Sequence, residues 1–230
     1  METGQISAVA ALVDALAWPV VALIVLCVLA GPVRRLLARE GATLSGPGFA
    51  ISTGSATAAL ARANADKSGK QRNEREVGQQ IRRAAAIIGR QTEQPHVLWV
   101  DDHPRNNRFE TEALRALGFV VTPVTSTQEA LDELRGSPGY YDLVISDMGR
   151  GDDPRAGYTL LSRMRTELDQ TPVIFYSSSN DPRHDQEARR RGALGSTNDP
   201  ALLVEKVVTA VDSAEADAAP PRWRRRHGGR

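Results

Sequence analysis

Short apolar runs alternate with segments of helical periodicity along the second half of the chain. The runs have the length and composition of buried strands, and the segments between them repeat apolar residues every three or four positions, as amphipathic helices do. One such segment is STQEALDELRG at 126–136. The predicted strands are 96–100, 119–121, 142–146, 172–176 and 194–197. A helical pattern also follows the last strand, so strand–helix units fill a predicted domain at 95–211.

This alternation predicts an α/β fold in which helices cover both faces of a parallel sheet. The cores of the first and third strands are continuous apolar runs, as expected of strands that are covered on both faces. We expect a flavodoxin-like, doubly wound (βα)5 sheet with the strand order 2-1-3-4-5. In this order the first and third strands are neighbours, and ligands bind beyond the carboxyl ends of the strands.

An uncharged apolar stretch, ALAWPVVALIVLCVLAGPV at 15–33, precedes this domain. A helix of this length, at about 1.5 Å per residue, spans the roughly 30 Å hydrocarbon core of a bilayer. We therefore predict a transmembrane helix in preference to a buried core helix, which is usually shorter or has a polar face. A cleaved signal peptide is disfavoured because the short N-terminal segment 1–14 has no Lys or Arg.

Arginines follow the apolar stretch directly, as Arg34, Arg35 and Arg39. The positive-inside rule then places the long C-terminal part of the chain in the cytoplasm. The sequence thus predicts a single-pass protein of the inner (plasma) membrane with a cytoplasmic C-terminal domain.

The region 34–94 is predicted to be a juxtamembrane linker, because residues 40–70 are rich in Gly, Ser, Ala and Thr. A short strand at 49–52 is compatible with the pattern. Farther along, 73–90 carries one apolar helical stripe. This helix has two interpretations: a short dimerising or signal-transmitting helix, or a helix that lies against the next domain or forms only in part.

Charge and cysteine content exclude several classes of protein. Lys and Arg number 29 against 28 Asp and Glu, which gives a net charge of +1, so we expect no specific nucleic-acid partner. The single cysteine, Cys27, rules out a disulfide framework and a cysteine metal site. The basic sequence APPRWRRRHGGR ends the region 212–230, which we predict to be a disordered tail. Binding of this tail to anionic lipid or nucleic acid is the alternative to simple solvation.

Carboxylates follow two predicted strands that should be neighbours in the sheet. Asp101 and Asp102 follow the first strand, Asp147 follows the third, and Ser177 follows the fourth. Each aspartate alone is explained as a helix N-cap or a turn residue. Three converging carboxylates raise one another's pKa unless a cation neutralises them. Mg²⁺ prefers oxygen ligands and suits this set better than zinc, so Mg²⁺ is the predicted cofactor.

A magnesium ion beside a strand-end carboxylate and a hydroxyl is a workable site for phosphoryl transfer to the carboxylate. The ordered motifs VLWVDD, DLVISDM, AGYTLL, PVIFYSS and GALG resemble the receiver domain of two-component response regulators. The resemblance covers 95–211, about half of the chain. It implies a CheY-like domain that accepts a phosphoryl group from a histidine kinase or a phosphotransfer protein.

The resemblance also implies a role for each matching residue. Asp147 matches the phosphoacceptor, and Asp101 and Asp102 match the acidic pair that holds the metal, with Asp102 as the more direct ligand. Gly149 matches the position whose backbone carbonyl completes the metal site. Ser177 matches the residue whose hydroxyl senses the phosphoryl group.

Two positions depart from the family pattern. Asp199 stands where receivers carry a lysine that contacts the phosphate, and Ser196 stands where they carry an aromatic residue that moves with the switch. An acid in the lysine position removes a positive charge and disfavours an added phosphate. Arg150 or Arg155, in the loop after the phosphoacceptor, could compensate, but we expect both to be exposed loop residues.

The sequence leaves three functions open. The first is a membrane-anchored receiver with no enzymatic activity beyond its own phosphorylation on Asp147, which signals through protein contacts or through the anchor. Its expected partners are an unidentified cytoplasmic protein and, in a possible homodimer, a second copy of the chain. The second is a receiver-like interaction module that works without phosphate. The third, a Mg²⁺-dependent phosphohydrolase, is disfavoured because Gly149 stands where such enzymes carry an acid/base carboxylate. His103 and His184 are expected to be surface residues.

Overall fold

The computed structural model describes residues 43–46, 49–68, 73–179 and 181–217. Within these residues a two-stranded hairpin precedes a five-stranded sheet. The elements are β1 (Thr43–Gly46), β2 (Phe49–Ser52), α2 (Thr53–Ser68), α3 (Glu74–Ile88), β3 (His96–Val100), η1 (Pro104–Asn107), α4 (Arg108–Ala116), β4 (Val120–Val124), α5 (Thr127–Gly136), β5 (Leu143–Ser146), α6 (Ala156–Thr166), β6 (Val173–Tyr176), α7 (Pro182–Arg190), β7 (Gly195–Thr197) and α8 (Pro200–Asp217).

The five-stranded sheet has the predicted strand order. The order is β4-β3-β5-β6-β7 and every neighbouring pair is parallel, which is 2-1-3-4-5 for the strands of the predicted domain. The flavodoxin-like fold is therefore confirmed. β3 lies between β4 and β5, and its last residue, Val100, is paired with Val124 on one side and Ser146 on the other.

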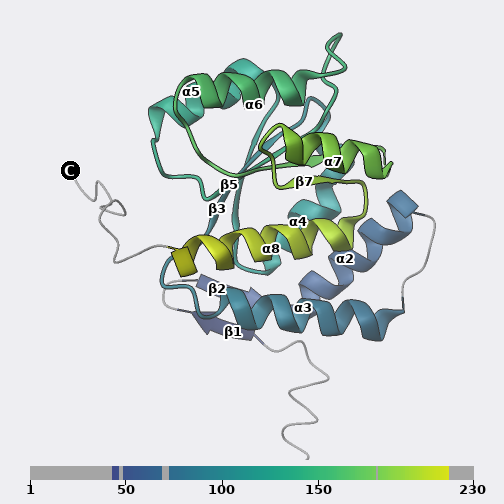
Figure 1. The fold of residues 1–230 in the computed structure, drawn as a ribbon. Coiled ribbons are helices and arrows are strands. Elements are labelled where there is room, and N and C mark those ends of the chain that lie inside the picture. The colour runs from purple at the N-terminus through teal and green to yellow at the C-terminus, as the bar shows by residue number, and fades with distance from the viewer. Residues whose placement is uncertain (1–42, 47–48, 69–72, 180, 218–230) are drawn as a thin grey trace, which may run out of the picture. The chain divides into compact units, whose positions relative to one another are not determined.

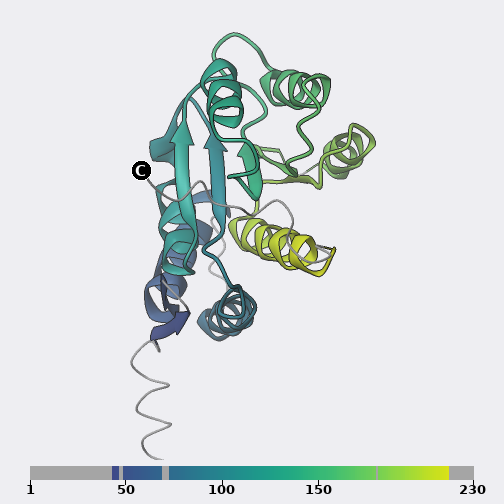
Figure 2. The same cartoon turned by 90° about the vertical axis from the view of Figure 1, so that its left-hand side faces the viewer.

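Helices cover both faces of the sheet, with α5, α6 and α7 on one side and α4 and α8 on the other (Figures 1 and 2). Successive residues of β3 point to opposite faces, as in any strand. Leu98 and Val100 join the core beneath α5 and α6, whereas Val97 and Trp99 join the core beneath α4 and α8. The sheet is thus buried on both faces, which explains the continuous apolar runs.

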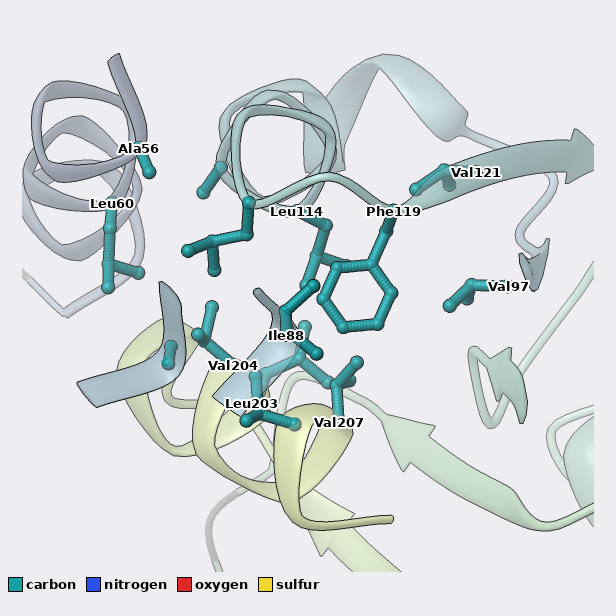
Figure 3. Close-up of a cluster of buried hydrophobic side chains, with 14 of the residues drawn as sticks. Ala56, Leu60, Ile88, Val97, Leu114, Phe119, Val121, Leu203, Val204 and Val207 are labelled. Atoms are coloured by element: carbon teal, nitrogen blue, oxygen red, sulfur yellow. The ribbon is translucent and has the colours of Figure 1, made fainter. Parts of the chain in front are cut away.

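A further layer covers α4 and α8 (Figure 1). This N-terminal layer consists of β1, β2, α2 and α3; α2 contacts α4 and α8, and α3 contacts α8. Leu60 and Ile88 of the layer are fully buried in the same hydrophobic cluster as Leu114 of α4, Phe119 and Val204 of α8 (Figure 3). The N-terminal layer and the sheet domain therefore share one core.

The prediction that 34–94 is a linker with one amphipathic helix is wrong for 53–68, which form the helix α2. Small residues are common in linkers, but here they form a helix interface: Ala56, Ala59 and Ala63 are buried and allow α2 to pack closely. The strand expected at 49–52 is β2.

The amphipathic helix expected at 73–90 is α3. Asn73 begins the helix, and its side chain accepts a hydrogen bond from the backbone N–H of Arg75 at 3.0 Å. The apolar stripe, which includes Val77, Ile81 and Ile88, is buried in the shared core. The structure therefore supports a helix that lies against the next domain, because the stripe that dimerisation would need is buried within the chain.

The remaining predictions concern the two ends of the chain. α8 continues to Asp217, so the first part of the expected disordered tail, 212–217, is helical; residues 218–230 lie outside the described residues. The short segment 1–14 and the expected transmembrane helix 15–33 also lie outside them. Among the helices that are described, none is long and apolar enough to cross a membrane.

Candidate functional site

The predicted aspartates converge at the carboxyl ends of two adjacent strands. Asp101 and Asp102 directly follow β3, and Asp147 directly follows β5. The backbone N–H of Asp147 donates to the carbonyl of Val100 at 2.9 Å, which places the two strand ends side by side. The parallel pairing of β3 and β5 thus places the three aspartates at one edge of the sheet.

Asp101 is buried and held from two directions. Its Oδ1 accepts a hydrogen bond from the backbone N–H of His103 at 2.6 Å, and its Oδ2 accepts one from the side-chain amide of Asn107. Asn107 is itself only 3% exposed. The carboxylate of Asp101 is therefore fixed in one orientation by its own turn and by η1.

Asp102 lies nearer the surface and is bound by the loop that follows β5. Its Oδ2 accepts a hydrogen bond from the backbone N–H of Gly151 at 2.9 Å, and its Oδ1 lies 3.0 Å from Nδ1 of His103. The Gly151 bond is the main reason why the pKa of Asp102 lies below its usual range. In turn, the hydrogen bond to Asp102 raises the pKa of His103.

His103 belongs to the acidic site, although sequence reasoning treated it only as a surface residue. Its side chain is 72% exposed, as expected. Ligand atoms of Asp101, Asp102 and His103 nevertheless lie within 4.8 Å of one another; among the described residues this group of potential metal ligands does not include Asp147. Its position next to the acidic pair was the signal that could have identified it.

Of the two site aspartates whose pKa is shifted, Asp102 and Asp147, Asp147 is the more deeply buried. Burial raises its pKa above the usual range, and the charges of Asp101 and Asp102 raise it further. A hydrogen bond from the backbone N–H of Met148 to Oδ1, at 2.7 Å, and the charge of Arg150 act in the opposite direction. A bound cation would favour the ionised form of Asp147, so the residues fit a divalent metal with oxygen ligands.

Arg150 is buried beside Asp147, which corrects the expectation that it is an exposed loop residue. Its Nη1 donates to Ser146 Oγ at 2.7 Å and to the carbonyl of Asp147 at 2.6 Å. Its Nη2 donates to Thr127 Oγ1 and to the carbonyl of Ala156, both at 3.0 Å. Burial lowers the pKa of Arg150, but a guanidinium keeps its charge in proteins. The site therefore contains a fixed positive charge.

The other loop arginine, Arg155, is exposed as expected. Gly149 lies between β5 and α6 at the start of this loop, and its predicted part in metal binding stays a prediction.

Asp199, which stands in the lysine position of the family pattern, caps a helix. Its Oδ1 accepts hydrogen bonds from the backbone N–H groups of Ala201, at 2.8 Å, and Leu202, at 3.2 Å, in the first turn of α8. Ser177 follows β6 and is half-buried, and its N–H donates to Thr197 at 3.1 Å. Ser196 is buried in β7, and its N–H donates to Asp185 Oδ1 at 2.7 Å. Polar residues with hydrogen-bonding roles in the fold thus stand at both positions where this chain differs from the family pattern.

One cavity of the structure lies away from this site. It has a volume of about 860 Å³ and is lined by Leu134, Tyr141, Met164 and Pro172, among others. Tyr141 and Pro172 precede β5 and β6, so the cavity lies at the amino ends of these strands, whereas the acidic site lies at the carboxyl ends of β3 and β5.

Comparisons with known proteins agree with this arrangement. The family model for the response regulator receiver domain matches residues 97–201. The two-component response regulator ORR3 of Oryza sativa subsp. japonica is 31% identical over 102 residues, which are 44% of this chain and 76% of that protein. The chain belongs to the response regulator receiver family. Receiver homologues are signalling proteins and not, in general, enzymes.

Other matches also cover about half of this chain. The two-component response regulator ARR10 of Arabidopsis thaliana is 35% identical over 97 residues, which are 42% of this chain but only 17% of that protein. Among solved structures, CheY4 of Vibrio cholerae is 22% identical with a TM-score of 0.45, and the match covers 51% of this chain and 99% of that chain. A CheY-like receiver domain protein from Methanospirillum hungatei JF-1 is 19% identical with a TM-score of 0.47, over 55% and 100% of the two chains.

Proposed function

We propose that this receiver accepts a phosphoryl group on Asp147 in a Mg²⁺-dependent phosphorelay. The observation that carries the proposal is the convergence of Asp101, Asp102 and Asp147 at the ends of β3 and β5, in a chain that belongs to the receiver family. The donor is a histidine kinase, a phosphotransfer protein or a small acyl phosphate.

In this proposal an oxygen of Asp147 attacks the phosphorus atom of the donor. The new bond joins this oxygen to phosphorus, and the bond from phosphorus to the donor's leaving atom breaks and leaves its electron pair on the donor. Oδ1 is held by the N–H of Met148, and no described residue donates a hydrogen bond to Oδ2, so Oδ2 is the attacking atom. Ser177 is the residue whose hydroxyl would bond the transferred group.

Asp101, Asp102, Asp147 and the carbonyl of Gly149 would hold the metal ion. When bound, Mg²⁺ neutralises the charge that gathers on the transferring oxygens. Arg150 supplies a second positive charge from the buried side, where its hydrogen bonds hold the backbone at Asp147. Asp199 caps α8, and the charge of Arg150 lowers the pKa of Asp147; in this proposal Arg150 therefore partly replaces the charge that the family lysine would supply.

Beryllofluoride binding tests this proposal, because beryllofluoride imitates an aspartyl phosphate. We expect the full chain to bind it only in the presence of Mg²⁺, and we expect Asp147→Asn to abolish binding. Arg155→Met changes an exposed residue of the same loop and serves as the control. Equal binding by wild type and Asp147→Asn would refute the proposal.

A receiver-like module that works without phosphate is the second candidate. Its supporting observation is that Asp199 is used as a helix cap and brings no positive charge to the acidic site. In that case Asp147→Asn would leave the binding of the protein partner unchanged.

We also propose that residues 15–33 anchor the chain in the inner (plasma) membrane, with the receiver in the cytoplasm. The support for this is the uncharged apolar stretch and the arginines that follow it. Membrane fractionation tests it: we expect the full chain in the membrane fraction, and a chain that lacks residues 1–40 in the soluble fraction. Recovery of the full chain in the soluble fraction would contradict it.

A further inference from the structure

The last turn of α2 reaches the acidic site from outside the segment that matches the receiver family. The match begins at residue 97, whereas α2 spans Thr53–Ser68. α2 packs along α4, which follows β3 and η1, and this packing brings Lys67 next to η1. The N-terminal layer therefore contributes a charged side chain close to the proposed phosphoacceptor site.

Lys67 is connected to Asp101 through one side chain. Nζ of Lys67 donates to Oδ1 of Asn107 at 3.0 Å, and Nδ2 of Asn107 donates to Oδ2 of Asp101. Asn107 is 3% exposed and Asp101 is 7% exposed, so water has little access to the bond between them, whereas Lys67 itself is an exposed residue. The path from α2 to the acidic site is two hydrogen bonds long.

The two partners of Asn107 together fix the orientation of its amide. An ammonium group can only donate hydrogen bonds, and an ionised carboxylate can only accept them. If the amide were turned over, its NH₂ would face Lys67 and its oxygen would face Asp101, and both bonds would be lost. Lys67 therefore selects the orientation in which Asn107 donates to Asp101.

A second contact holds Lys67 in place. Its Nζ lies 5.0 Å from the centre of the Tyr176 ring, within the range of a cation–π interaction. The hydroxyl of Tyr176 donates to Oε1 of the buried Glu110 at 2.7 Å, so the ring is itself fixed. Tyr176 ends β6 and immediately precedes Ser177. Lys67 is thus held by η1 and by the end of β6.

We propose that Lys67 is a positioning residue of the acidic site: it orients Asn107, which orients Asp101 for the metal, and it thereby links metal binding to the docking of α2. This inference rests on the proposed Mg²⁺ site. The linkage is reciprocal, so a metal that binds more tightly when Lys67 is in place also stabilises the docked α2 by the same factor.

The direction in which Mg²⁺ affinity changes when Lys67 is substituted distinguishes a positioning role from a purely electrostatic one. Lys67 is a positive charge near a site for a cation, so loss of its charge alone would strengthen Mg²⁺ binding. Loss of the orientation of Asn107 and Asp101 would weaken Mg²⁺ binding. A substitution that removes the ammonium group therefore gives opposite results under the two explanations.

Titration calorimetry of Mg²⁺ with the full chain measures this effect. We expect Lys67→Met to raise the dissociation constant by about three- to tenfold, the scale of one net hydrogen bond. Lys67→Arg keeps a charged donor and should bind nearly as well as wild type. Arg62→Met removes an exposed charge from the same helix and should have no effect.

A double-mutant cycle tests the route through Asn107. Asn107→Ala should weaken Mg²⁺ binding, and adding Lys67→Met to it should produce no further change. Hydrogen exchange should show that Mg²⁺ protects the last turn of α2 in wild type and not in Asn107→Ala. Thermal unfolding of each variant would show that it is folded.

Unchanged or tighter Mg²⁺ binding by Lys67→Met would overturn the inference and leave the proposed function intact. The same conclusion would follow if Lys67→Met weakened binding equally in wild type and in Asn107→Ala. Absence of Mg²⁺ binding by wild type would overturn both the inference and the metal requirement of the proposed function.

Discussion

Arg150 lies beneath the backbone of Asp147, with its Nη1 2.6 Å from the Asp147 carbonyl oxygen. The same guanidinium joins three further groups, on β5, α5 and α6. The buried Arg150 thus links the backbone of the proposed phosphoacceptor to β5, α5 and α6 through hydrogen bonds.

This relationship predicts a large effect of Arg150→Met on stability. The substitution leaves several buried acceptors without a donor, so we expect the free energy of unfolding to fall by about 3 kcal/mol. Urea denaturation measures it. Arg155→Met, which changes an exposed arginine of the same loop, should alter stability by less than about 0.5 kcal/mol. An equal fall in the free energy of unfolding in the two variants would contradict a stabilising role for the hydrogen bonds of Arg150.

The capping role of Asp199 predicts that its side-chain oxygen matters more to stability than its charge. Asp199→Ala should lower the free energy of unfolding by about 1 kcal/mol, whereas Asp199→Asn, which keeps an acceptor, should remain close to wild type. Chemical denaturation distinguishes these results. If Asp199→Asn were as unstable as Asp199→Ala, helix capping would not account for the contribution of Asp199 to stability.

Gly118 tests the docking of the N-terminal layer. Its φ is +95°, and a Cβ at this position would lie 2.7 Å from Cδ2 of Phe49 in β2. Gly118→Ala should therefore destabilise the protein by about 1–3 kcal/mol, from backbone strain and from displacement of β2. In a Phe49→Ala background the loss should be smaller, because only the strain and the milder contact with Cγ1 of Ile51, at 3.3 Å, remain.

Gly136→Ala is the matched control for this experiment. It adds a methyl group at the end of α5, where a Cβ would meet nothing within 4 Å. We expect it to leave stability unchanged or to raise it by up to about 1 kcal/mol. An equal effect of Gly118→Ala in the presence and absence of Phe49 would show that β2 does not pack there.

The raised pKa of Asp147 predicts how stability depends on pH in the absence of metal. A carboxyl group whose pKa is raised on folding destabilises the folded state when ionised, and this penalty disappears as the pH falls from the folded pKa toward the unfolded value near 3.8. Asp147→Asn should therefore be more stable than wild type at neutral pH.

Urea denaturation of both proteins between neutral pH and about pH 4, with a chelator present, measures this difference. We expect the advantage of Asp147→Asn to shrink as the pH falls. If the difference in the free energy of unfolding between Asp147→Asn and wild type did not change with pH, the ionisation of Asp147 would not be what destabilises the folded state.

The sheet and the acidic site could be predicted from the sequence because both depend on local pattern and on strand order. Continuous apolar runs identified β3 and β5, and the doubly wound order placed Asp101 and Asp147 at neighbouring strand ends. The packing partners of individual side chains could not be predicted in this way.

Three features required the structure for that reason. The alanines of α2 resembled a linker because small residues suit both flexible segments and close helix packing. The burial of Arg150 depends on carbonyls and hydroxyls that three separate segments bring together. The contact between Lys67 and Asn107 joins residues that are 40 positions apart.

Phosphorylation with labelled acetyl phosphate and Mg²⁺ tests the central claim most directly. We predict that wild type takes up label that is sensitive to hydroxylamine, as an aspartyl phosphate is, and that omission of Mg²⁺ or the substitution Asp147→Asn abolishes uptake. No uptake by wild type, or equal uptake by Asp147→Asn, would contradict the account of this chain as a phosphorylated receiver.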